Sequence, residues 1–177
     1  MDSATGFAFV TDDAALNQAL FRVTHGLYIL TSRSSERTNG QCLDALMQVT
    51  NAPPRVVIGV GKRSLTHEMI AGSGRFAVSV IDREDPARAE LIRRFGFHSG
   101  RDMDKFEGID HALGRSGLPF LPTAVAVFEC EVDAKMTLDL ETHSLFVGRV
   151  ERAGTRDGGT PFTYNEYRNS LLKRKDL

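Results

Sequence analysis

The sequence predicts a mainly β fold, in which a few short helices flank an antiparallel barrel. Several segments alternate apolar and polar residues with the two-residue period of a strand. Turn signals rich in Gly, Pro and Asn separate these segments, and the stretches with a helical period are few and short. This pattern favours a barrel over a doubly wound parallel sheet, because the latter needs strands and longer helices in regular alternation.

The composition predicts one globular domain over residues 1–177, because this length can bury a core and neither a repeat nor a linker divides the chain. Lys and Arg total 22 against 23 Asp and Glu, so no overall field attracts nucleic acid or an anionic membrane. A signal peptide's basic start and a run of ~20 apolar residues are both missing, which disfavours secretion and membrane insertion. Cys42 and Cys130 lie far apart without a CxxC pair, which indicates a reducing cytoplasm and no metal.

The first elements follow from capping and turn signals. Thr11 or Asp12 can cap a helix that Gly26 would end. Residues 27–32 (LYILTS) are predicted to form a buried strand, and the polar segment after it contains Asn39-Gly40, a strong hairpin signal. The next strand is therefore expected to run antiparallel to the first.

Residues 41–50 (QCLDALMQVT) alternate cleanly and are predicted to form one strand with a core face and a polar face. Pro53-Pro54 separates it from a further strand over 55–61 (RVVIGVG). In that strand Gly59 and Gly61 leave one face without side chains, which admits a close neighbour. The predicted core face of 41–50 consists of Leu43, Ala45, Met47 and Val49, and its polar face of Cys42, Asp44, Leu46, Gln48 and Thr50.

The remainder of the chain predicts further strands and two more capped helices. Ser64 suits the N-cap of a helix over 65–72, and Asp85 followed by Pro86 suits the start of a helix over 86–95. Strands are expected over 76–81, 123–136 and 143–153, a terminal helix from about Thr163, and irregular chain between about 96 and 122.

Several catalytic motifs are missing from the sequence. The segment GVGKRS fails as a phosphate-binding P-loop, because Val56 stands where the first glycine is needed and Arg63 follows the lysine. No HExxH, GxSxG or paired-carboxylate pattern is present, and the five histidines do not cluster. A hydrolase or a metalloenzyme is therefore poorly supported.

The segment after Gly61 has the features of an anion site. A helix that begins near Ser64 offers unpaired backbone N–H groups, while Lys62 adds a positive charge and Thr66 a hydroxyl. A phosphate would suit this position. From these residues alone, a capped surface helix with solvated cations is the simpler interpretation, and water is an equally simple partner for the polar face of 41–50.

Five blocks, taken in order, resemble the flavin reductase-like, FMN-binding split-barrel family, with the closest likeness to flavoredoxins and to the flavodomain of high-molecular-weight rubredoxins. The resemblance covers about residues 15–168. It implies a six-stranded antiparallel split barrel that forms a homodimer and holds FMN non-covalently near the subunit interface. The blocks are GLYILTSRSSERTNGQCLDALMQVTNAPPRVVIGVGKRSLTHEMI, FAVSVI, FGFHSGRDMDKFEG, THSLFVGRV and PFTYNEY.

The resemblance also implies where FMN would bind. Lys62, Ser64 and Thr66 would lie beside the phosphate and ribityl chain, and Phe95 to Ser99 would form a loop beside the ring. His143 would approach the isoalloxazine, and His143 and His98 are the candidates for a catalytic side chain, although the flavin itself carries the chemistry. The full expected set is Thr31, Ser32, Asn39, Gly40, Gln41, Cys42, Leu43, Gln48, Thr50, Lys62, Ser64, Thr66, Phe97, His143 and Tyr164.

Three positions depart from the family pattern: Leu43 and Asp44 replace a small residue and an Asn, and Glu141 replaces a Gly. A bulkier or more anionic neighbour would disfavour the reduced flavin anion. Purely structural roles also remain open, with His143 at a strand start, Phe97 in a core and Tyr164 on a docked helix.

The resemblance implies an NAD(P)H-dependent flavoprotein oxidoreductase. It would take hydride from NADH or NADPH and pass electrons to free flavin, a small redox protein or a metal-centre partner. Two alternatives stay open: an FMN electron carrier without its own NAD(P)H site, and a cofactor-free structural or sensor dimer.

Overall fold

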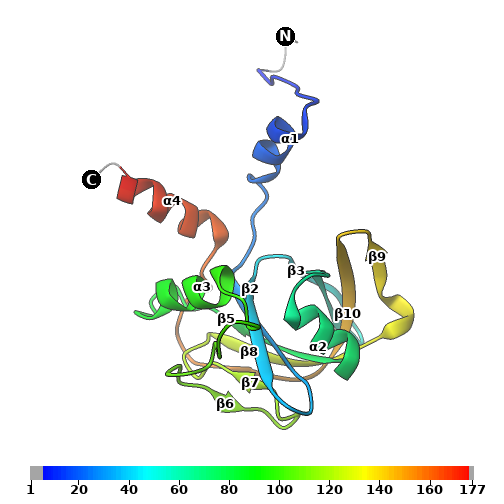
Figure 1. Ribbon diagram of the computed structural model, residues 1–177. Coiled ribbons are helices and arrows are strands. Elements are labelled where there is room, and N and C mark those ends of the chain that lie inside the picture. The colour runs from blue at the N-terminus through cyan, green and yellow to red at the C-terminus, as the bar shows by residue number, and fades with distance from the viewer. Residues whose placement is uncertain (1–5, 176–177) are drawn as a thin grey trace.

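A computed structural model describes residues 6–175, which form a curved antiparallel sheet with flanking helices (Figure 1). Helices α1 and α4 project from one end of this body in both ribbon views. The elements are α1 (Asp13–Leu20), β1 (Tyr28–Arg33), β2 (Thr38–Leu43), β3 (Leu46–Asn51), β4 (Pro54–Gly61), α2 (Leu65–Ser73), β5 (Arg75–Val80), α3 (Arg88–Phe97), β6 (Ala112–Leu113), β7 (Pro119–Phe120), β8 (Ala126–Val132), a 3₁₀ helix (Ala134–Met136), β9 (Leu138–Leu140), β10 (His143–Thr155) and α4 (Tyr164–Lys175).

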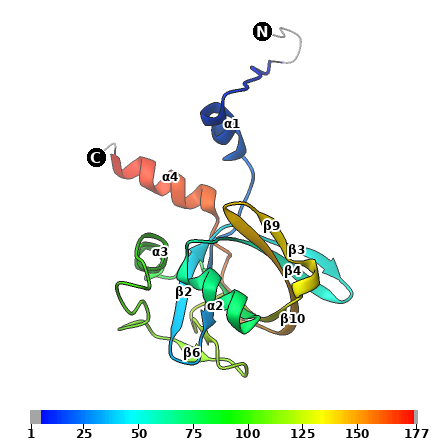
Figure 2. The same cartoon turned by 45° about the vertical axis from the view of Figure 1, so that its right-hand side comes forward.

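The main sheet has the strand order β2-β1-β5-β8-β10-β4-β3, with β9 paired to β10. Strands β2 and β3 lie at opposite edges, yet only Asp44 and Ala45 separate them in the chain. The sheet must therefore curl until its two edges approach each other, which gives the open ring seen in Figure 2. The predicted mainly β, split-barrel-like class is confirmed, and the barrel is not closed.

The expected count of six strands is too low, because the main sheet has eight. The segment 41–50 was predicted as one strand but contributes to two, since the chain leaves the sheet at Asp44 and Ala45. The short β9 supplies the other additional strand by pairing with β10.

The β1–β2 hairpin turns earlier than predicted. Asn39 and Gly40 lie inside β2, where they pair with Ser32 and Thr31. The turn falls at Ser34–Arg37 because the Ser34 Oγ accepts hydrogen bonds from two backbone N–H groups of the turn, each at 3.3 Å. The predicted antiparallel pairing of the two strands is confirmed.

The predicted core face of 41–50 is buried only at Leu43. On β3, Met47 is 60% exposed and Val49 42% exposed, so the expected division into a core face and a polar face is wrong for this strand. The physical reason is that β3 is an edge strand and no described element of this chain covers it.

Helix starts agree better with the prediction than helix ends. Asp12 caps α1 as predicted, but the helix ends at Leu20 rather than near Gly26, and none of its residues is buried. Helix α3 begins at Arg88, two residues after the predicted Pro86, because Asp85 Oδ1 accepts a hydrogen bond from Ala87 N (2.7 Å) in a turn that precedes the helix. The terminal helix starts where predicted.

Two apolar cores fill the body. One lies inside the curved sheet, and the other lies between the sheet and α3. Helix α2 packs on β1 and β2 and buries Thr66, Met69 and Ile70. Among residues 6–175, none of the helices combines the length and the apolar character needed to cross a membrane. The inner core contains Leu30, Leu43, Val56, Ile58, Val60, Ile70, Phe76, Val78, Cys130 and Phe146.

Candidate functional site

The first part of the candidate site is the start of α2. Ser64 caps the helix as predicted, since its Oγ accepts a hydrogen bond from His67 N (3.1 Å). Lys62 Nζ lies 2.5 Å from Asp139 Oδ1, and this hydrogen bond is the main cause of the lowered pKa of the Asp139 carboxyl. The pair is solvent-exposed on the Asp139 side, so it stabilises the fold little and a phosphate could replace the carboxylate.

Thr66 and Asn39 join α2 to the start of β2. Asn39 Nδ2 donates a hydrogen bond of 3.0 Å to Thr66 Oγ1, and both side chains are less than 5% exposed. Gly100 covers the pair so closely that a Cβ on it would lie 2.0 Å from Asn39 Oδ1. The structure thus brings these two predicted residues together, and their polar groups bind each other.

Strand β2 contributes the residues from Gly40 to Leu43. A Cβ on Gly40 would lie 3.0 Å from the Phe95 ring, so a side chain there would push α3 off the strand. Burial raises the pKa of the Cys42 thiol to about 12, which rules this cysteine out as a nucleophile near neutral pH. Gln41 Oε1 is buried and has no hydrogen-bond partner among the described residues.

Lys105 was not predicted as a site residue, yet it lies directly beside β2. Its Nζ donates to the carbonyl oxygens of Gly40 (3.0 Å) and Phe95 (3.2 Å), and the side chain is 4% exposed. Burial lowers its pKa to about 8. None of the described carboxylates lies within ion-pair distance of this ammonium group.

Sequence reasoning had little chance of finding Lys105. It lies between Asp104 and Phe106 in a segment without periodicity, where a lysine is normally solvated. The one available signal was its place inside FGFHSGRDMDKFEG, a block that carries the family resemblance.

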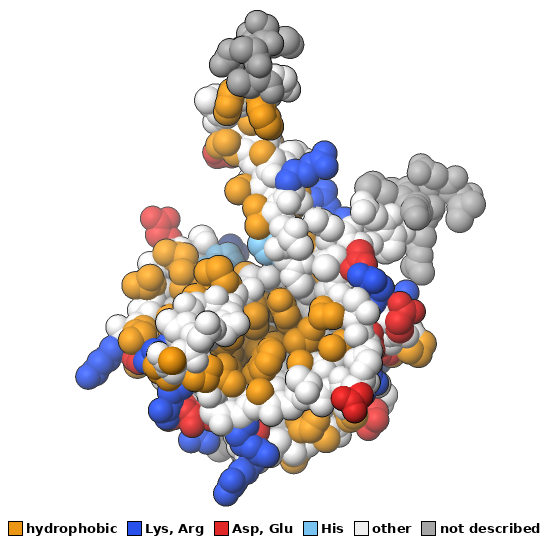
Figure 3. All heavy atoms as spheres, turned by 180° about the vertical axis from the view of Figure 1, so that it is seen from behind, with side chains coloured by type: hydrophobic (Ala, Val, Ile, Leu, Met, Phe, Trp, Pro, Cys, Tyr) orange, Lys and Arg blue, Asp and Glu red, His pale blue; other side chains and the backbone are white. Residues whose placement is uncertain are grey.

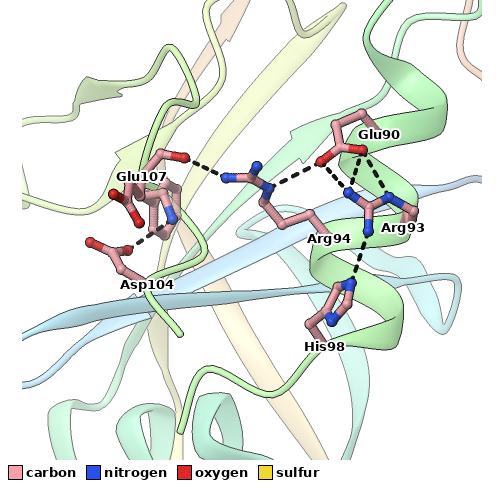
Figure 4. A network of polar contacts seen from close by, with 7 residues as sticks. Glu90, Arg93, Arg94, His98, Asp104 and Glu107 are labelled. Carbon is pink, nitrogen blue, oxygen red and sulfur yellow. Dashed lines mark hydrogen bonds and ion pairs between the residues drawn. The ribbon is translucent and has the colours of Figure 1, made fainter. Parts of the chain in front are cut away.

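The residues expected to form a loop beside the ring are the end of α3. Phe97 is 70% exposed and closes the helix, so the expectation of a loop over 95–97 is wrong. Arg93 Nη1 donates to His98 Nε2 (3.0 Å), and Glu90 accepts hydrogen bonds from both Arg93 and Arg94 (Figure 4). In the same network Arg94 donates to the carbonyl oxygen of Glu107, which fixes the following loop against the helix.

His143 lies at the start of β10, opposite Gly61 of β4. Its ring is exposed, and its Nδ1 lies 2.9 Å from Thr142 Oγ1. A Cβ on Gly61 would meet His143 Nε2 at 3.5 Å, and one on Gly59 would meet Ala45 Cβ at 3.3 Å. The close neighbours of Gly59 and Gly61 are therefore residues of the same chain, Ala45 and His143.

The side chains of four predicted residues form hydrogen bonds to other parts of the chain. The hydroxyls of Thr31 and Ser32 are 1% and 0% exposed and donate to the carbonyl oxygens of Pro119 (2.6 Å) and Arg75 (2.8 Å), so the fold itself uses them. Gln48 and Thr50 lie on β3, at the opposite sheet edge from β2, and make only local hydrogen bonds.

Tyr164 begins α4 and is half-buried against the core that contains Phe95 and borders Cys42. Its backbone N–H donates to the carbonyl oxygen of His25 (2.9 Å), which fixes the helix start beside β1. The structure therefore brings Tyr164 to the same side as β2 and α3.

The residues around β2 fit a bound flavin. An isoalloxazine ring presents an N–H donor and several acceptors, and it gains negative charge on reduction. Among the described residues, the Gln41 Oε1 acceptor has no hydrogen-bond partner, and the Lys105 ammonium group donates to two carbonyl oxygens but has no carboxylate beside it. A donor and a negative charge on the ring would complement these two groups. The exposed Phe97, two residues after Phe95 in α3, offers an aromatic surface.

Comparison with known proteins defines the class. The family model described as "Flavin reductase like domain" matches residues 20–170, so the chain belongs to this family of flavin reductase-like oxidoreductases. The predicted family, the fold class and the general activity class are confirmed.

Three relatives illustrate the likeness. The chain is 41% identical over 150 residues to a high molecular weight rubredoxin of Moorella thermoacetica, covering 85% of this chain and 64% of that protein. It is 36% identical over 158 residues to a ferric-chelate reductase (NAD(P)H) of Archaeoglobus fulgidus, covering 89% and 90% of the two chains. The NADH:FAD oxidoreductase of Streptomyces globisporus, in complex with NAD and FAD fragments, has a TM-score of 0.77 at 27% identity over 88% of this chain and 92% of that one.

Proposed function

We propose that the protein binds FMN non-covalently, takes hydride from NADH or NADPH, and passes the electrons to free flavin or to a small redox protein. The observation that carries the proposal is the buried Lys105 ammonium group, which lies against the backbone of β2 without a carboxylate. A positive charge in that place is costly unless something negative shares the site. The reductase names of the relatives support the donor.

When bound, FMN would supply the hydride chemistry, and the chain's residues would bind, orient and shield it. Backbone N–H groups near residues 40–43 and the Lys105 ammonium group would favour negative charge on that side of the ring. Phe97 would cover the ring, while His143 and His98 are the candidates for proton transfer at its edge. The Cys42 thiol would pack without reacting, since its pKa is raised.

The phosphate of FMN would lie at the start of α2, beside Lys62 and Ser64, with Thr66 beneath them. A double variant, Lys62→Ala with Ser64→Ala, is expected to weaken FMN binding about tenfold while lowering stability by only about 1 kcal/mol, because it removes a charged contact and a helix cap. Lys135→Ala, an exposed lysine on the 3₁₀ helix, is the control. An unchanged FMN affinity in the double variant would refute the phosphate placement.

The activity itself is tested by anaerobic mixing. FMN-loaded protein is expected to bleach near the flavin absorption bands within seconds of adding NADH or NADPH. Absence of bleaching, with FMN still bound, would favour the alternative of an electron carrier that another protein reduces. Protein that stays colourless after incubation with FMN would leave only a structural or sensor role.

The two free cysteines suit a protein of the reducing cytoplasm, which is the compartment we propose.

We also propose that the protein forms a homodimer. Hydrophobic side chains gather in a hollow on the face opposite Figure 1 (Figure 3). Met47 on β3 and Leu138 and Leu140 on β9 are each about half exposed or more, and a second copy would cover them. Light scattering at increasing concentration is expected to give twice the chain mass, and Met47→Asp is expected to lower it.

A further inference from the structure

The N-terminal arm, defined as residues 6–23, exposes an apolar stripe. Leu16 and Leu20 of α1 and Val23 just after it are exposed, and their spacing places them on one side of the helix. None of the residues of α1 is buried, and within the described part of the chain neither apolar core contains a residue of the arm. The arm projects from the body in both ribbon views, and Figure 3 shows hydrophobic side chains along it.

The base of the arm is fixed to α4, so the fold sets its projection. Gly26 forms an antiparallel bridge with Thr163, and the guanidinium carbon of Arg168 lies 3.9 Å from the centre of the Phe21 ring. Beyond this anchor, a helix as short as α1 is marginal in water unless its apolar side packs on another surface. The described part of its own chain does not supply that surface.

The outer face of the sheet carries apolar rows that suit such a helix. Val57 of β4 pairs with Val147 of β10 on one side and with Met47 of β3 on the other. In the next row Leu145 of β10 pairs with Leu138 of β9. Directly paired residues share a face, and this face is opposite the inner core. The two rows form one apolar surface, with Met47 and Leu138 as its most exposed members.

A basic row borders this apolar surface. One row beyond the valines, Arg55 of β4 pairs directly with Arg149 of β10, and Glu131 of β8 stands on the other side of Arg149. Arg149 also has an ion pair with Glu151 (2.6 Å). Among the described residues, Arg55 has no carboxylate within 4.0 Å, and its buried Nε has no hydrogen-bond partner. Like charges directly opposite each other destabilise a strand pair, so a carboxylate from outside the chain would offset this repulsion.

The arm carries the complementary features. Asp13 lies one turn before Leu16, so an acidic group begins the apolar stripe, and this carboxylate has no ion pair among the described residues. We propose that the arm of each copy packs on the outer face of β9, β10, β4 and β3 of a second copy, with Asp13 beside Arg55. Because one chain carries both surfaces, a two-fold axis satisfies both contacts at once. This inference rests on the proposed homodimer and names the segment that forms its interface.

The first experiment measures the dimer dissociation constant of the full chain by sedimentation. Leu16→Asp with Leu20→Asp is expected to raise this constant about 100-fold, because two leucine side chains lose their burial. Ala14→Asp with Gln18→Glu adds the same charge on the opposite side of α1 and is the control. Since no residue of α1 is buried, both variants should keep the fold of the body.

An unchanged constant in the leucine variant would mean that the arm folds on its own body or binds a different protein, and it would overturn the inference. An equal loss in the control would overturn it too. If Met47→Asp still dissociated the dimer in the first case, the homodimer would stand without the arm contact. Anaerobic bleaching does not depend on the arm, so the proposed activity and this inference can fail separately.

The second experiment reverses the charges. Asp13→Arg and Arg55→Asp are each expected to weaken the dimer about fivefold, and the two together are expected to recover most of the loss, because the ion pair is restored with its charges exchanged. Asp13→Arg combined with Arg33→Asp, at an exposed arginine of β1, is the control and should show no recovery. Absence of recovery with Arg55→Asp, or equal recovery with Arg33→Asp, would overturn this placement of the arm.

Discussion

The ammonium nitrogen of Lys105 lies 3.0 Å from the carbonyl oxygen of Gly40 and 3.2 Å from that of Phe95. One side chain thus ties the middle of β2 to the last turn of α3, where the helix carbonyls carry partial negative charge. The two bonds do not neutralise the cation, and desolvation by burial lowers its pKa from 10.5 to about 8.

The lowered pKa of Lys105 predicts a distinct pH dependence of stability. Between pH 8 and 10.5 the unfolded chain keeps a proton that the folded protein has released, so this lysine makes stability rise with pH in that window. We expect the difference in unfolding free energy between wild type and Lys105→Met to shift by on the order of 2 kcal/mol, in favour of wild type, from pH 7.5 to pH 10. Denaturant unfolding at several pH values measures it.

Lys135→Met provides the control for that series, because Lys135 is exposed. A constant difference between wild type and Lys105→Met across the pH range would mean that the Lys105 amine titrates normally and is not desolvated.

Thr66→Val is predicted to destabilise the fold by about 1–3 kcal/mol, because it leaves the buried Asn39 Nδ2 without its acceptor. Thr66→Ser keeps the hydroxyl and should cost less, although it removes a buried methyl group. Thermal and urea unfolding measure both changes. Equal destabilisation by the two variants would assign the role of Thr66 to packing and not to this hydrogen bond.

Local signals predicted the elements well where local chemistry decides them. The caps at Asp12 and Ser64 were identified, as was the burial alternation of Val56, Ile58 and Val60, because each depends on residues a few positions apart. The turn at Ser34–Arg37 was missed, since the Asn39-Gly40 signal outweighed a serine side chain that bonds two backbone N–H groups.

Long-range arrangement limited the prediction of the site. Asn39 and Thr66 were both predicted, but nothing in the sequence indicated that they bind each other. The burial of Lys105 depends on how α3 docks on β2, a contact between segments with no common periodicity. The exposure of Met47 follows from the edge position of β3, and alternation alone cannot distinguish an edge strand from a central one.

Two Gly→Ala substitutions are predicted to act in opposite directions. A Cβ on Gly148 of β10 would lie 2.5 Å from Phe76 Cζ and 3.1 Å from Cys130 Cβ, so Gly148→Ala should cost about 1–3 kcal/mol by overpacking the inner core. Gly72 lies inside α2, and a Cβ added there would have nothing within 4 Å. Gly72→Ala should therefore raise the free energy of unfolding by about 0.5–1 kcal/mol. Unfolding of both variants by urea compares them, and a Gly148→Ala variant as stable as wild type would contradict this packing of β10 on Phe76.

The lowered pKa of Asp82 predicts a second pH dependence of stability, at acidic pH. Its buried carboxylate accepts hydrogen bonds from Glu84 N (3.1 Å) and Thr160 N (3.2 Å) and pairs with Arg156. These contacts, led by the Glu84 N–H, hold the Asp82 pKa below its ordinary value of 3.8. The stabilisation is therefore present above that value and is lost as the pH falls through the lower, folded-state pKa.

Asp82→Asn is thus expected to lower the free energy of unfolding by about 2 kcal/mol at pH 7, because charge-assisted hydrogen bonds are replaced by neutral ones. The difference in unfolding free energy between wild type and Asp82→Asn should narrow as the pH falls below 4, where the wild-type carboxyl also becomes neutral. Asp110→Asn, at an exposed position, is the matched control. A gap that stays constant from pH 7 to pH 2.5 would show that Asp82 contributes through shape alone, and that its charge does not hold the segment around Thr160 to the end of β5.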